Sequence, residues 1–126
     1  MDKQNIEFNT IDKLLQVKKY DLAFEKLNQI SKEQKEQFRY VNLLCRYLMI
    51  KKDYQQVYRV LSNKKFKNLN YQILWCDYYN KIENIEKMQK AVDKLISLNP
   101  PEKIKLINLE RLSVLKSDFL AAANYV

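Results

Sequence analysis

Apolar residues recur along the chain at intervals of three and four, which is the period of an amphipathic α-helix. Residues 43–50 carry one such stripe, residues 54–61 carry a second, and the polar triplet Lys51-Lys52-Asp53 separates them. Alternating runs of β-branched residues are scarce, and the chain has no Asn-Gly or Asp-Gly dipeptide of the kind that starts tight hairpins. The pattern predicts an all-α protein in which a helix, a short turn and a second helix follow one another.

The same helix–turn–helix pattern repeats at a regular spacing along the sequence. The segments Lys18–Asp21 and Lys51–Tyr54 each follow an apolar stretch and lead into another. Spacings of 34, 31 and 34 residues separate the aligned positions at which the second helices are expected to begin, which are Tyr20, Tyr54, Ile85 and Phe119. A period near 34 with two helices per repeat is the signature of a helical solenoid. The sequence therefore predicts stacked antiparallel helix pairs.

One repeat carries a recognisable motif. It has Trp75, Cys76 and Tyr79 in its first helix, then Val92, and it closes with Pro100. This spacing resembles that of the tetratricopeptide repeat (TPR) family. The resemblance implies a single domain folded as a right-handed α-solenoid of about three and a half to four helix-pair repeats. These repeats are expected at residues 5–32, 36–63, 69–100 and 101–126, the last one incomplete, with its second helix beginning near Phe119.

The turns of this solenoid must be made without glycine, because the chain has none. Asparagine tolerates a left-handed backbone better than most other residues do. We therefore expect asparagines to occupy the left-handed turn positions, namely Asn28, Asn63, Asn84 and Asn99.

Composition argues against catalysis. The 126 residues include no glycine and no histidine. Phosphate-cradling glycine loops, histidine-activated nucleophiles and histidine metal sites are therefore excluded. The two cysteines, Cys45 and Cys76, are too few for a four-thiolate zinc site and are expected to be small, buried, inert residues. The sequence predicts a protein that is not an enzyme and needs no cofactor.

The chain is basic, with a formal charge of +8, and 19 of its 23 basic residues are lysines interspersed with polar residues. Such mixing is typical of a solvated surface. The N-terminal residues do not form a secretory signal, and no apolar run approaches the length of a membrane span. We expect a cytoplasmic, reducing compartment with no membrane partner, and the nucleus is not excluded.

The TPR resemblance also implies a binding surface, the concave face formed by the outward positions of each first helix. The planar guanidinium of arginine can donate two parallel hydrogen bonds to a carboxylate, and amide side chains can form hydrogen bonds with a peptide backbone. The favoured function is a scaffold or adaptor that binds a protein or peptide partner through an acidic or C-terminal segment. The partner-binding residues implied by the resemblance are Arg39, Asn42, Arg46, Asn70, Asp77, Asn80, Lys81, Asn108 and Arg111.

Three alternatives stay open at this point. Trp75 and Tyr78 could stack nucleobases in an RNA-binding helical-repeat module, although Trp75 and Tyr79 are four residues apart and are expected to pack in the core. The chain could be the N-terminal extension of a larger enzyme, such as a transferase, that lies beyond Val126. It could also self-associate through the uncapped C-terminal helix.

Overall fold

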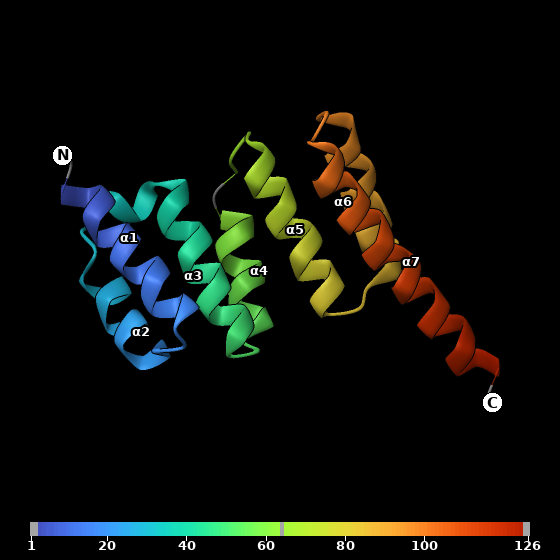
Figure 1. The fold of residues 1–126 in the computed structure, drawn as a ribbon, viewed down its shortest axis with the longest axis horizontal. Coiled ribbons are helices and arrows are strands. Elements are labelled where there is room, and N and C mark those ends of the chain that lie inside the picture. Colours follow the sequence, from blue (N-terminus) through green and yellow to red (C-terminus); the bar gives the residue numbers. More distant parts are fainter. Residues whose placement is uncertain (1–2, 64, 125–126) are drawn as a thin grey trace. The chain divides into compact units, whose positions relative to one another are not determined.

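Helices make up most of the chain in a computed structural model that describes residues 3–63 and 65–124 (Figure 1). No strand occurs in this part of the chain, so the all-α prediction is confirmed there. No helix in the same ranges has both the length and the apolar character needed to cross a membrane. In chain order the elements are α1 (Lys3–Gln16), α2 (Tyr20–Gln29), the 3-10 turn η1 (Gln34–Glu36), α3 (Phe38–Ile50), α4 (Tyr54–Asn63), α5 (Leu69–Lys81), α6 (Ile85–Ser97) and α7 (Glu102–Asn124).

The chain divides into two compact units, unit 1 (Met1–Phe66) and unit 2 (Lys67–Val126). Within unit 1, α1 packs on α2 and α3 packs on α4, while α3 also contacts α1 and α2. Within unit 2, α5 packs on α6, and α7 contacts both. The expected helix pairs are therefore present as α1–α2, α3–α4 and α5–α6.

The core of unit 1 is built from apolar pairs four residues apart, one pair on each of three helices. These residues are at most 9% exposed, and burying them supplies the main favourable contribution to folding. The pairs are Ile11 and Leu15 on α1, Ala23 and Leu27 on α2, and Leu43 and Tyr47 on α3.

The core of unit 2 follows the same rule. Met88 and Val92 on α6 are fully buried, and they pack with Leu112 and Leu115 of α7. The amphipathic pattern of the sequence therefore places the correct faces inward in both units.

The turns inside the three helix pairs share one backbone geometry. Lys18, Lys52 and Glu83 have left-handed φ angles of 64°, 61° and 58°. The next residue in each turn donates its backbone N–H to a carbonyl five positions back, at 2.9 Å from Lys19 to Leu14 in the first turn. This arrangement is the Schellman motif that closes a helix C-terminus.

The expectation that asparagines fill the left-handed positions is wrong in three cases. Of the four asparagines named above, all within the described ranges, only Asn99 has a positive φ, at 54°. The left-handed residue is set by its place one step past the helix C-cap, where two hydrogen bonds to helix carbonyls hold it. Asn84 follows that position instead and caps α6, accepting the Lys87 N–H at 3.0 Å.

The C-terminal region also differs from the prediction. A second helix was expected to begin near Phe119, but α7 runs without interruption from Glu102 to Asn124. Lys116-Ser117-Asp118 contains neither glycine nor proline, and the leucine, lysine and alanine residues around it favour continued helix. The turn expected at this point does not form.

Candidate interaction surface

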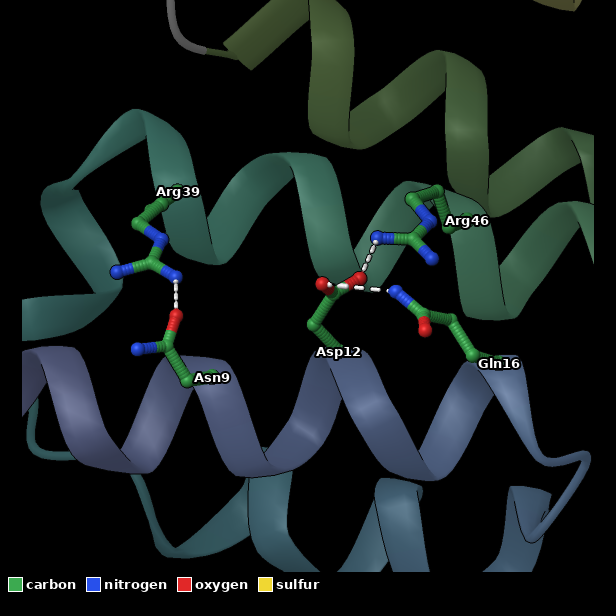
Figure 2. A network of polar contacts seen from close by, with 5 residues as sticks. All are labelled: Asn9, Asp12, Gln16, Arg39 and Arg46. Atoms are coloured by element: carbon green, nitrogen blue, oxygen red, sulfur yellow. Dashed lines mark hydrogen bonds and ion pairs between the residues drawn. The ribbon is translucent and has the colours of Figure 1, made fainter.

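A row of polar side chains joins α1 to α3 in unit 1 (Figure 2). Asn9, Asp12 and Gln16 lie three and four residues apart and so share one face of α1. Arg39 and Arg46, two turns apart on α3, meet them. We call these five residues the α1–α3 row.

Asp12 is the centre of this row. Arg46 Nη1 donates to Asp12 Oδ1 at 2.5 Å, and Gln16 Nε2 donates to Asp12 Oδ2 at 3.1 Å, as Figure 2 shows. The side chains of Arg46 and Asp12 remain 36% and 37% exposed. A guanidinium has five N–H donors, so the ion pair holds Arg46 in place and leaves further N–H groups that can donate to a ligand.

Arg39 is held in a similar way at the other end of the row. Its Nη2 donates to Asn9 Oδ1. Its guanidinium carbon lies 5.4 Å from the ring centroid of Phe8, which is buried. Cation–π attraction of this kind favours one orientation of the guanidinium.

Unit 2 contains an ion pair of the same kind. Arg111 Nη1 on α7 donates to Asp77 Oδ1 on α5 at 2.5 Å, and the two side chains are 40% and 30% exposed. Burial raises the pKa of Asp77 above its ordinary value, although the hydrogen bond and charge of Arg111 and the charge of Lys81 act in the opposite direction. The loss of hydration therefore outweighs the attraction of the guanidinium.

The two ion pairs occupy matching positions in the sequence. In each, the arginine follows the aspartate by 34 residues. In each, the aspartate lies on the first helix of a pair, α1 or α5. The arginine lies on the helix that follows that pair, α3 or α7. The left-handed turn residues Lys18 and Glu83 keep the same relation, since 65 positions separate Lys18 from Glu83, Asp12 from Asp77 and Arg46 from Arg111.

The structure brings some of the predicted binding residues together. Asp77 and Arg111 are in contact. Arg39 binds Asn9 and Arg46 binds Asp12, two α1 residues that the sequence reasoning missed. The 34-residue period was the available signal, because it pairs Asp12 with Arg46. The remaining predicted side chains are half-buried at Asn42 and Asn80 and exposed at Asn70 and Lys81.

Asn108 was expected on the outer binding face, and this is wrong. It is 2% exposed, its Nδ2 donates to the carbonyl of Ile104 at 2.9 Å, and its buried Oδ1 has no hydrogen-bond partner among the described residues. The reason is helical phase, because Leu112 and Leu115 lie on the same face of α7 and belong to the core. The matching residue 65 positions earlier is Leu43, a core residue of unit 1.

The cysteines are free and buried, as expected. Burial raises the pKa of Cys45 to about 12. Burial and the neighbouring Asp77 charge raise the pKa of Cys76 to about 12 as well, with Arg111 opposing. Neither thiol is suited to act as a nucleophile, because the nucleophile is the thiolate.

The aromatic residues of α5 pack mainly on one another. Trp75 stacks on Tyr79 at 5.5 Å between ring centroids, and Tyr79 lies against the core of unit 2. Tyr71 and Tyr78 are buried, and Trp75 is half-buried. Tyr79 is half-buried as well, so the core assignment is confirmed in part for both residues.

No protein-family model, curated protein or solved structure matches this chain. The TPR resemblance therefore stays a prediction.

Proposed function

We propose that the chain is a non-catalytic interaction scaffold with TPR-like helix pairs, and that unit 1 binds an extended peptide segment along the α1–α3 row. The observation that supports this most directly is the recurrence of one aspartate–arginine contact at a separation of 34 residues in each unit. Each ion pair leaves partly exposed hydrogen-bonding groups on its own unit, and directed donors of this kind suit the backbone of an extended peptide.

The geometry also refines the chemistry of the proposed ligand. In the α1–α3 row two arginines stand beside one aspartate, so the net charge of the row is small. Attraction by charge alone is therefore weak, and recognition depends on directed hydrogen bonds from Arg39, Arg46 and Gln16. Peptide carbonyls and a single carboxylate, from an acidic side chain or a C-terminus, suit these donors.

A charge exchange within one ion pair tests the proposal without breaking the fold. Arg46→Glu alone would place a carboxylate against Asp12 and destabilise unit 1, so loss of binding could reflect loss of structure. The double variant Asp12→Arg with Arg46→Asp keeps the pair but exchanges which helix carries the guanidinium. Bait proteins of both kinds are used to capture partners from lysate, and the captured proteins are compared by mass spectrometry.

We expect the exchanged variant to melt close to the wild-type temperature and to lose the partners that the wild-type chain captures. A matched control is Lys90→Gln, which removes the exposed Glu86–Lys90 pair at 3.6 Å on the outer side of α6. The control should retain the wild-type partners. Identical captured proteins for the wild type and the exchanged variant would show that the row is not the binding surface.

RNA binding is the second candidate, and one feature of unit 1 favours it. Asn9–Arg39 and Asp12–Arg46 show that α1 and α3 run in the same direction, so the turns after them lie at the same end of unit 1, as Figure 1 shows. The exposed lysines at this edge are Lys18, Lys19, Lys51 and Lys52. RNA binding there predicts affinity that falls steeply with salt, through counterion release. A peptide bound by the α1–α3 row should show a much weaker salt dependence.

A further inference from the structure

An apolar cavity on unit 2 lies between the α5–α6 turn and the C-terminal half of α7. It is open to solvent and has a volume of about 740 Å³. Its apolar walls are Ile82 and Ile85 on one side and Phe119 and Leu120 on the other.

The two apolar residues of α7 in this cavity also project from the surface. Phe119 is 64% exposed and Leu120 is 62% exposed. They stand next to each other, one turn beyond Leu115, the last core residue of α7. Contiguous apolar surface of this kind marks an interaction site more often than isolated exposed side chains do.

Comparison of the two units shows that α7 lacks the cover that α3 has. The 65-residue relation places α7 in the position of α3, and α3 is packed against α4. Within the described residues of unit 2 no helix follows α7. Leu106 of α7 is 55% exposed, whereas Val41, its counterpart on α3, is 2% exposed. Leu106 is thus exposed at a position whose counterpart in unit 1 is buried, and Phe119 and Leu120 lie beyond the part of α7 that corresponds to α3.

We propose that a second copy of this chain covers the surface, and that the two copies pair through the same patch around a two-fold axis. Phe119 and Leu120 of each copy enter the cavity of the other copy and pack against Ile82 and Ile85. A second copy is the occupant that the chemistry favours, because the patch contains both the projecting side chains and the cavity that receives them. Such self-complementarity is what an isologous dimer requires.

The charges around the cavity are self-complementary too. Glu83 and Glu86 line it on the α6 side, and Lys116 lines it on the α7 side. In the paired arrangement Lys116 of one copy approaches the glutamates of the other copy. Their present contacts are exposed ones, from Lys116 Nζ to Gln89 Oε1 at 2.7 Å and from Lys90 Nζ to Glu86 Oε1 at 3.6 Å, and exposed contacts are exchanged at little cost.

Sedimentation velocity from about 1 µM to about 100 µM tests the pairing directly. We expect the mass to rise with concentration from that of the 15.3 kDa chain to twice that value and to stop there. The double variant Phe119→Ser with Leu120→Ser should stay at the mass of one chain. The matched control is Val17→Ser with Leu22→Ser, which removes two exposed apolar side chains from unit 1 and should still dimerise.

A charge exchange distinguishes a specific dimer from non-specific hydrophobic association. Lys116→Glu should weaken the dimer by about tenfold, and Lys116→Glu combined with Glu83→Lys and Glu86→Lys should restore it. Unchanged melting temperatures show that every variant is folded. The proposal is overturned by a wild-type chain that remains single, by masses that grow beyond two copies, by a dimer insensitive to Phe119 and Leu120, or by failure of the charge rescue. These outcomes do not involve the α1–α3 row, so they are independent of the proposed peptide binding.

Discussion

Asp77 lies 2.5 Å from the guanidinium of Arg111, and its pKa is nevertheless raised by burial. An aspartate beside an arginine ordinarily has a lowered pKa, because the positive charge favours the carboxylate. In unit 2 the loss of hydration is the larger effect. The ionised carboxylate of Asp77 is therefore less favourable in the folded chain than in water, even with Arg111 beside it.

The first prediction concerns the pH dependence of stability. A folded-state pKa raised above the ordinary value of 3.8 means that the folded chain binds this proton more tightly than the unfolded chain does. The contribution to stability is complete below that value and is lost as the pH rises through the raised pKa. Asp77→Asn removes this titration.

Urea unfolding of both proteins between about pH 4 and about pH 7 measures the effect. We expect the free energy of unfolding of the wild type, minus that of Asp77→Asn, to decrease as the pH rises. An increase over the same range would mean that Arg111 favours the carboxylate more than burial disfavours it.

The second prediction concerns Asn108, whose buried Oδ1 has no partner in the described part of the chain. Replacing it with leucine, the residue at the matching position 43, removes a desolvated polar atom and extends the unit 2 core. We expect Asn108→Leu to stabilise the chain by about 1–2 kcal/mol. Denaturant titration measures this, with Asn70→Leu at an exposed site of α5 as the control. Destabilisation by Asn108→Leu would show that the amide makes a contact the structure does not record.

The third prediction concerns the strained turns. A left-handed backbone costs a residue with a Cβ atom about 1–2 kcal/mol, and replacing that residue with glycine removes this cost. Part of the gain is lost again, because glycine gives up more backbone entropy on folding than other residues do. Lys18→Gly and Glu83→Gly should each raise the free energy of unfolding by about 0.5–1 kcal/mol. Glu25→Gly, in the interior of α2, should lower it by a similar amount. Equal losses in all three variants would contradict the turn geometry.

The fourth prediction concerns the thiols. A shift of the Cys45 pKa from 9.0 to about 12 lowers its thiolate fraction near neutral pH by about a thousandfold. Both cysteines should react with a disulfide reagent slowly in native buffer and rapidly in urea. Rapid reaction of either thiol in the folded chain would show that its site opens to solvent.

The sequence predicted those features that depend on local periodicity. The turn at Lys51–Asp53 and the apolar stripe that contains the core pair Leu43 and Tyr47 follow from residues close together in the chain. Positions that depend on tertiary packing were missed or misassigned. Asp12 was overlooked because its role exists only when α3 lies beside α1. Asn108 was placed on the surface because the TPR resemblance assigned it to an outward position of the first helix.

The left-handed turns show how position overrides residue preference. Asparagine was expected there, yet lysine and glutamate occupy the three Schellman positions. The hydrogen bonds to the helix carbonyls fix the backbone, and the side chain then points into solvent at Lys18, Lys52 and Glu83. Comparing repeats by the 34-residue period, rather than residue by residue, would have corrected this prediction and the placement of Asn108.

The proposed peptide binding is tested most directly by selecting ligands from a displayed library of random peptides on the wild-type chain. The affinity of the selected peptides is then measured by fluorescence anisotropy for the wild type, for Lys90→Gln and for Asp12→Arg with Arg46→Asp. We expect tight binding to the first two proteins and a loss of about tenfold or more with the exchanged pair. Failure to select any peptide, or equal affinity for all three folded proteins, would contradict binding along the α1–α3 row.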